Sequence, residues 1–513
     1  MDDLAEKGHH ALSSSPTSDD NRWPSDDASV VPDLALPVPS ALRRLNARIE
    51  GLSGFEARGI KRVEPDERQP ASLGQDMQVF LLWLSANISL NNLGVGLLGP
   101  MLLNLGFVDS AICAVLGAFL GTWSTAYMAT WGPQSGNRTM VVCRYFMGYW
   151  PSKIPCLLNI ILMIGYCTID AIIGGQVLSA VSGGGMSVVV GVIVVSVACW
   201  VIAVFGMSLF QKYERFAWLP QVIALFVLIG CAGPYFDSSA PSTVSGTALH
   251  AARLTYFSLC SYVPNSWSAA AADFYVYYPE NTSRRKIFFL TLGGLWTAFC
   301  FVYLIAIGLA TGVANRPSWA EANEISTGAL IVAGYDPLKG FGKVCAVIVS
   351  LGVIANSVPG TYSSALGCQT LGRYGKAVPR WVWSSVLVLI QLVLGLAGRQ
   401  NLFDIYSNFV SLMGYWIEFM ACICVQEQLI FRRHKGYDWS RWEDKSYLPI
   451  GWAALISFLL GWMGAVLGMS QAWYVGPISK LAADADLGMW VGFGITFITF
   501  PPLRHLELKY VGR

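Results

Sequence analysis

The feature that most limits the possible folds of this chain is a series of apolar stretches that recurs from residue 76 to residue 503. A helix needs about 20 mostly apolar residues to cross the hydrocarbon core of a bilayer. Only 13% of the 513 residues are charged, against about 25% in a typical soluble domain. The sequence therefore predicts an all-α polytopic membrane protein with 12 transmembrane helices. The predicted spans are 76–100, 108–131, 153–182, 187–209, 216–236, 255–278, 287–313, 341–368, 381–398, 402–425, 447–468 and 487–503.

The basic residues between these spans predict the orientation of the chain. With the N-terminus inside, the cytoplasmic loops hold 16 Lys and Arg residues and the outer loops hold 6. This excess follows the positive-inside rule and places both termini in the cytoplasm. We expect residues 1–70, which open with a polar stretch rich in Ser, Asp and Pro, to be a disordered tail. Residues 71–503 then form the membrane domain, and residues 504–513 form a short cytoplasmic tail.

Several classes of function are disfavoured by composition. A net charge of +2 without a basic cluster predicts no nucleic-acid partner. Most of the 12 cysteines lie inside apolar stretches without paired zinc-ligand spacing, so no metal site is expected. All five histidines lie in tails or loops, and no nucleophile–base pair occurs at membrane depth. The chain is therefore not expected to be an enzyme or to hold a cofactor.

Asp170 is a carboxylate in the otherwise apolar third span, and no Lys or Arg lies in the middle of any predicted span. An ionisable group at bilayer depth is costly and indicates a functional site. The cost is avoided if Asp170 binds a cation, takes up a proton or hydrogen-bonds a polar ligand. The alternative is an acid that stays protonated and bonds a neighbouring helix. Since buried acids in spans usually face a cavity or the bundle interior, we favour the functional interpretation.

The first and sixth spans are predicted to be interrupted. Three Asn and three Gly lie between residues 85 and 100. Pro264 lacks an N–H, and the following Asn265 and Ser266 can satisfy freed backbone groups. Broken helices at matching positions of two inverted repeats, here about 76–236 and 255–425, indicate a substrate site near the membrane midplane. The alternative is that these residues only kink packed helices.

Five groups of motifs follow one another along the chain. They are Ser85-Ala-Asn with Leu97-Leu-Gly-Pro, Gly132-Pro-Gln-Ser-Gly-Asn-Arg-Thr-Met140, Gly165-Tyr-Cys-Thr-Ile-Asp170 with Gly174-Gly-Gln176, Ala272-Asp-Phe-Tyr-Val-Tyr-Tyr-Pro279, and Asn356-Ser-Val-Pro359 with Tyr362-Ser363. Together these motifs resemble the fungal purine–cytosine permeases of the nucleobase–cation symporter-1 family. The resemblance implies a leucine-transporter-type bundle with a 5+5 inverted repeat and two extra helices at 447–503. It also implies proton-coupled uptake of nucleobases at the plasma membrane.

A nucleobase site needs an aromatic plane for stacking and polar groups that read the edge of the ring. Tyr166 and Asp170 are four residues apart and share one face of the third span. Relatives look to carry Trp and an amide at these two places, and this departure leaves the exact substrate open. By resemblance, Trp267 is the second aromatic of a stacking sandwich. The structural alternatives are a packed Tyr166 and an interfacial Trp267.

By resemblance, Asn356 supplies a substrate-binding amide, and Asn91 and Asn92 are candidates for the same role. An interhelical hydrogen bond is the alternative for Asn356. Sodium-dependent relatives place several hydroxyls on the eighth span, where Val349-Ser350-Leu351-Gly352 offers one. A complete sodium cage is therefore not expected. Asp170 is the predicted proton-coupling residue, ahead of Asp273 and Glu418.

These observations predict a symporter that imports cytosine and the purines adenine, guanine and hypoxanthine together with a proton by alternating access. Its partners are the nucleobase, the proton and the lipid bilayer. Two alternatives stay open. One is a symporter for another small heterocycle, such as uracil, allantoin or a nucleoside. The other is a membrane sensor that binds the ligand without moving it.

Overall fold

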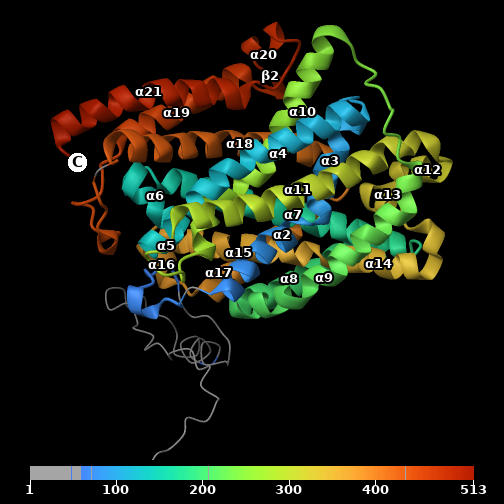
Figure 1. Cartoon of the computed structure of the whole chain (residues 1–513), viewed down its shortest axis with the longest axis horizontal. Coiled ribbons are helices and arrows are strands. Elements are labelled where there is room, and N and C mark those ends of the chain that lie inside the picture. The colour runs from blue at the N-terminus through green and yellow to red at the C-terminus, as the bar shows by residue number, and fades with distance from the viewer. Residues whose placement is uncertain (1–47, 49–58, 71, 206, 434) are drawn as a thin grey trace, which may run out of the picture.

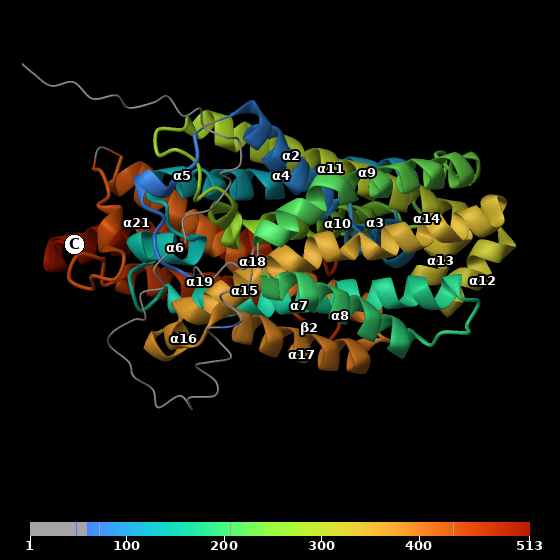
Figure 2. The ribbon, with the colours of Figure 1, turned by 90° about the horizontal axis from the view of Figure 1, so that it is seen from below.

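The computed structural model describes residue 48 and residues 59–70, 72–205, 207–433 and 435–513. Long helices lie side by side, and most of them run along the length of the molecule (Figure 1, Figure 2). They are α2 (Leu73–Asn87), α3 (Leu90–Leu102), α4 (Phe107–Ala129), α7 (Lys153–Val181), α8 (Val188–Phe205), α9 (Met207–Ala232), α10 (Gly246–Ser266), α11 (Arg284–Gly312), α14 (Lys339–Leu351), α15 (Val353–Thr370), α17 (Arg380–Gly398), α18 (Leu402–Gln426), α19 (Trp452–Gly468) and α21 (Gly488–Val511).

Short elements connect the long helices. The strands form an antiparallel pair in which Ser470 faces Val475 and Gln471 faces Tyr474. The short elements are α5 (Trp131–Ser135), α6 (Thr139–Met147), α12 (Pro317–Ile325), α13 (Thr327–Ala333), α16 (Arg373–Ala377), α20 (Pro477–Leu481), β1 (Ser470–Gln471) and β2 (Tyr474–Val475).

Each predicted span overlaps a helix among the described residues, which confirms the all-α membrane fold. By length and composition, the described residues contain 8 helices able to cross a membrane, or 9 if the bent pair α2–α3 is one span. The other predicted spans fall on α10, α19 and α21, which do not meet this test. The apolar part of α19 is short, α10 carries polar residues along its length, and the end of α21 is charged. The number 12 therefore stays a prediction.

Apolar side chains cover much of the outer surface of the bundle. Leu116 of α4, Trp200 of α8 and Leu389 of α17 are exposed. By contrast, α7 and α15 pack against each other inside the bundle, and most of their side chains are buried. An apolar surface of this extent is unfavourable in water and suits contact with lipid tails.

Two glycines let α10 come close to α4. A Cβ atom on Gly117 would clash with the carbonyl of Phe257, and one on Gly121 would clash with the carbonyl of Ser261. Glycines four residues apart allow two membrane helices to pack with their backbones in close approach. This contact brings the end of α10 to the middle of the bundle.

Both predicted interruptions are confirmed. α2 ends at Asn87, α3 begins at Leu90, and the two axes differ by 52°. α10 ends at Ser266, two residues after Pro264, and continues as the 3₁₀ turns η3 (Trp267–Ala269) and η4 (Ala271–Phe274). Gly352 is the one residue between α14 and α15, which together form a single long span, Asp336–Thr370.

The predicted N-terminal tail is corrected at its end. Residues 1–47 and 49–58 lie outside the described residues, but residues 59–70 pack against the bundle. Ile60 and Val63 are buried, and the Val63 N–H donates to the Gly136 carbonyl at 2.9 Å. The Arg68 guanidinium also donates to the carbonyl of Pro133 in α5. Two apolar side chains and an arginine anchor this segment, so the boundary at residue 70 is wrong.

The N-terminal segment at residues 59–70 and the end of α21 lie on the same face of the bundle. Arg513 donates to the carbonyl of Lys445 at 3.1 Å, in the loop between α18 and α19. Asn137 follows Gly136, whose carbonyl accepts from the Val63 N–H, and the Asn137 amide donates to the carbonyl of Trp439 in that same loop. A chain whose N-terminal segment and last helix end on the same side of the bundle crosses the membrane an even number of times. Which face is cytoplasmic stays a prediction.

Candidate substrate site

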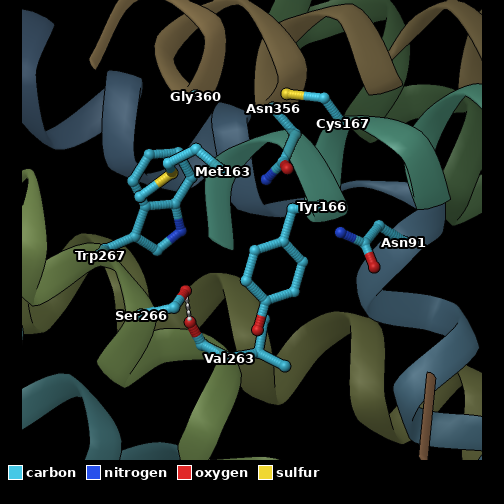
Figure 3. Close-up of a pocket in the computed structure, with 9 residues that line it drawn as sticks. All are labelled: Asn91, Met163, Tyr166, Cys167, Val263, Ser266, Trp267, Asn356 and Gly360. Carbon is cyan, nitrogen blue, oxygen red and sulfur yellow. Dashed lines mark hydrogen bonds between the residues drawn. The ribbon is translucent and has the colours of Figure 1, made fainter. Parts of the chain in front are cut away.

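A small cavity lies where the breaks in α2–α3 and α10 face α7 and α15 (Figure 3). Its volume is about 10 Å³, which is close to the space that one water molecule needs. A ring-sized ligand can therefore enter only after side chains or helices move. The cavity is lined by Asn91, Met163, Tyr166, Cys167, Val263, Ser266, Trp267, Asn356 and Gly360.

Two aromatic rings face this cavity, as Figure 3 shows for Trp267 and Tyr166. The ring centroids of Trp83 and Trp267 lie 5.8 Å apart, and the two ring planes form an angle of 82°. The ring centroids of Phe409 and Tyr166 also lie 5.8 Å apart, with an angle of 81° between the ring planes. Edge-to-face contacts of this kind are favourable and fix the orientation of a ring. Trp267 and Tyr166 are thus held by neighbours while part of each ring borders the cavity.

Asn87 positions Trp267. The indole Nε1–H of Trp267 donates to Asn87 Oδ1 at 2.8 Å, and Asn87 Nδ2 donates back to the Trp83 carbonyl at 2.9 Å. The Trp83 indole in turn donates to the Tyr275 hydroxyl at 2.9 Å. The sequence analysis did not assign this role to Asn87. Its signal was an amide on the last turn before a predicted helix break.

The three predicted amides have different surroundings. Asn91 lines the cavity, and neither atom of its amide has a hydrogen-bond partner among the described residues. Asn356 also lines the cavity, but its Nδ2 donates to the Ala86 carbonyl at 2.7 Å. Leaving a buried polar group unpaired costs about 1–3 kcal/mol. Asn91 is therefore the amide best placed to gain from a polar ligand.

Asn92 is not among the residues that line the cavity. Its Nδ2 donates to the Asn87 carbonyl at 2.7 Å. Successive residues of a helix point about 100° apart, so Asn92 turns toward the freed backbone while Asn91 faces the cavity. The predicted contact between Asn92 and substrate is thus not supported by this arrangement.

Asp170 also lies outside the cavity lining. Its side chain has no exposed area, Oδ2 accepts a hydrogen bond from the Ser357 hydroxyl at 2.8 Å, and Oδ1 has no partner among the described residues. Side chains four residues apart on a helix differ by about 40° around its axis. This difference directs Asp170 toward α15, whereas Tyr166 faces the cavity.

Two further acids that the sequence analysis considered make structural contacts. Asp273 accepts hydrogen bonds from the backbone N–H and hydroxyl of Thr139 and from the Ser363 hydroxyl. It thereby joins η4 to α6 and α15. Glu418 accepts from the amide of Asn265 at 2.9 Å. This bond turns Asn265 toward α18, so it does not offer a polar edge to the cavity.

Comparison with known sequences identifies the family of the chain. Residues 68–492 match the model of a family described as permease for cytosine/purines, uracil, thiamine, allantoin. The vitamin B6 transporter TPN1 of Saccharomyces cerevisiae is 31% identical over 545 residues, covering 94% of each chain. The purine-cytosine permease fcyB of Emericella nidulans is 31% identical over 475 residues, covering 92% of each chain.

Solved structures show the same fold at low sequence identity. Mhp1, a nucleobase–cation symport-1 transporter in a closed conformation with bromovinylhydantoin bound, matches with a TM-score of 0.62 and 14% identity. That match covers 89% of this chain and 96% of Mhp1. A Na⁺-coupled sialic acid symporter matches with a TM-score of 0.57 and 12% identity, covering 84% of this chain and 90% of the other. The chain belongs to the permease family for cytosine, purines, uracil, thiamine and allantoin, as its resemblance to the fungal purine–cytosine permeases predicts.

Proposed function

We propose that the protein is a proton-coupled symporter that imports small planar heterocycles across the plasma membrane, with cytosine and purines as its leading substrates. One observation carries the proposal: Trp267, Tyr166 and the Asn91 amide, which has no hydrogen-bond partner among the described residues, border a single cavity at the two helix breaks. An aromatic side chain can stack on any base, because every base has a flat π-face, and amides can bond the polar edge of the base. Movement of the breaks would open the cavity to each side in turn.

Vitamin B6 is the second candidate substrate. Similarity to a vitamin B6 transporter is as extensive as similarity to a purine-cytosine permease. Asp170 is the specific observation that favours this candidate. A carboxylate is the group that commonly pairs with a pyridinium nitrogen in proteins. Asp170 lies one turn from Tyr166 on α7 but outside the cavity lining, so it would reach a ligand only after the cavity opens. A nucleobase edge is instead well matched by amides.

An uptake panel tests the proposal. The full chain is produced in cells that lack their own nucleobase and vitamin B6 uptake, and entry of radiolabelled cytosine is measured with unlabelled adenine, uracil, allantoin and pyridoxine as competitors. We expect cytosine uptake that adenine inhibits. Uptake of labelled pyridoxine without cytosine uptake would assign the vitamin instead. Surface-expressed protein that takes up neither compound would exclude import of both and favour a sensor.

Replacement of Asp170 tests proton coupling. We expect wild-type uptake to rise as the outside is acidified and to be unchanged when choline replaces sodium. Asp170→Asn is expected to keep measurable substrate binding and to flatten the pH profile, because an amide still accepts from Ser357 but takes up no proton. Initial uptake rates over a series of external pH values are the measurement.

Glu418→Gln is the matched control for Asp170→Asn. It also neutralises a buried acid, and the new amide can still accept from Asn265. We expect this control to retain the pH dependence of the wild type. An Asp170→Asn variant with an unaltered pH profile would place the proton-coupling group elsewhere.

A further inference from the structure

At the break between α2 and α3, the backbone carbonyls of Ser85, Ala86, Asn87 and Ile88 have no helical N–H partner among the described residues, and the last three of them have other partners. In a continuous helix they would accept from the N–H groups four residues later. In transporters with broken helices, unwound carbonyls of this kind coordinate the coupling cation. The partners of these three oxygens therefore bear directly on ion coupling.

Each of the three carbonyls accepts a hydrogen bond from a side-chain amide. Asn356 Nδ2 donates to the Ala86 oxygen at 2.7 Å. Asn92 Nδ2 donates to the Asn87 oxygen at 2.7 Å. The third donor comes from outside the substrate site: Gln221 Nε2 donates to the Ile88 oxygen.

Gln221 reaches the break through a gap that the fold provides. It follows Pro220 in α9, and its side chain is buried. A Cβ atom on Gly352 would clash with the Gln221 amide. Gly352 is the residue between α14 and α15. Gly352 therefore leaves the space through which the amide of α9 approaches α2.

The residues around the break do not fit a sodium ion. Amide N–H groups carry partial positive charge, and here they point at the oxygens that a cation would need. The hydroxyl of Ser350, the one such group in the Val349–Gly352 stretch, donates to the Gly174 carbonyl on α7 at 3.0 Å. These three carbonyls and the hydroxyl are thus already satisfied by the protein itself.

We infer that Gln221 takes the place of a coupling cation at the α2–α3 break. Its amide holds the Ile88 carbonyl in position in the absence of sodium. Because Ile88 follows Asn87, which holds the Trp267 indole, Gln221 is a positioning residue for the substrate site. The inference deepens the proposed function, since it assigns a sodium-independent structure to the site through which the transporter would work.

Thermal unfolding of the purified full chain in detergent tests this inference without a substrate. Midpoints are compared in sodium chloride and in choline chloride at equal ionic strength. We expect equal midpoints for the wild type. Gln221→Ala is expected to have a lower midpoint in choline and a partial recovery in sodium, because the exposed carbonyl oxygen then accepts the ion. Sodium stabilisation of the wild type, or a Gln221→Ala midpoint that does not respond to sodium, would overturn the inference.

Gln391→Ala is the matched control. Gln391 is buried in α17, and its amide nitrogen has no hydrogen-bond partner among the described residues. Its replacement makes the same chemical change away from the break, so both salts should give the same midpoint. If Gln391→Ala responded to sodium as Gln221→Ala does, the response would not belong to the break.

Gln221→Glu provides a second test if Gln221→Ala does not fold. A carboxyl at this position can bond the Ile88 carbonyl only when it is protonated or when a cation bridges the two oxygens. We expect its midpoint to rise, relative to the wild type, on acidification or on addition of sodium. A midpoint that follows the wild type in both series would count against the inference. Absence of heterocycle uptake would instead overturn the proposed function and leave these midpoints unaffected.

Discussion

Trp267→Ala is expected to weaken substrate binding about tenfold to hundredfold, because stacking of a base on an aromatic ring contributes about 1–3 kcal/mol. The Trp267 ring borders the cavity, and its orientation is fixed by the Asn87 amide and by the edge of Trp83. Tyr166→Ala should have an effect of the same kind from the opposite helix. Inhibition constants for cytosine, adenine and pyridoxine in the uptake assay measure these changes.

Two further variants make the Trp267 experiment specific. Trp267→Phe keeps a ring but loses the N–H that bonds Asn87, so we expect an effect smaller than that of Trp267→Ala. Trp296→Ala removes a tryptophan of α11 that packs on Phe119 away from the cavity, and it should leave the inhibition constants unchanged. Surface fluorescence of tagged proteins corrects for expression. Wild-type constants in both Trp267→Ala and Tyr166→Ala would exclude the stacking site.

Arg504→Met is expected to destabilise the protein by about 3–5 kcal/mol, the usual cost of removing one partner of a buried ion pair. Arg504 makes a bidentate ion pair with Glu427. Its Nε and Nη2 atoms each lie 2.8 Å from a Glu427 carboxylate oxygen, and both side chains have almost no exposed area. It also pairs with Glu507 at 3.3 Å, whose carboxylate accepts from the Gly451 N–H. This cluster joins the end of α18, the start of α19 and the end of α21.

Thermal unfolding in detergent and the amount of protein at the cell surface measure the effect of Arg504→Met. Arg441→Met is the matched control, because Arg441 pairs with Asp444 at an exposed site, where an ion pair contributes about 0–1 kcal/mol. Adding Glu427→Gln to Arg504→Met should recover part of the loss, since it removes the charge left without its main partner. An Arg504→Met protein as stable as Arg441→Met would show that the cluster does not anchor these helices.

Local chemistry explains why the fold was predictable. Apolar stretches of membrane length have no stable alternative to helix in lipid, because every backbone group must be satisfied within the segment. The interruptions were predictable for a related reason: Pro264 and the Asn- and Gly-rich stretch near Asn91 weaken helix locally, whatever surrounds them. The end of the N-terminal tail was not predictable, since its packing depends on Ile60 and Val63 meeting a surface formed by distant residues.

The sequence by itself determined the helices and the two breaks. Together with the family resemblance it also indicated the candidate side chains Tyr166, Trp267, Asn91 and Asn356, which the structure brings to one cavity. Tertiary structure alone decided which polar groups face that cavity. Asn91 and Asn92 are chemically identical neighbours. The rotation between them lets Asn92 bond the Asn87 carbonyl and leaves the Asn91 amide without a partner among the described residues. Asp170 was predicted from its cost at membrane depth, but the crossing of α15 gives it Ser357 as a partner.

Gln221 shows the same limit of the sequence most clearly. It is a single polar residue in an apolar span, and nothing near it in the sequence indicates a partner. Its hydrogen bond depends on a gap at Gly352 and on a carbonyl freed at Ile88, both far away along the chain. Hydropathy and helix propensity act over short stretches of sequence. The direction of a buried amide depends on which backbone lies opposite, and only the packed bundle determines that.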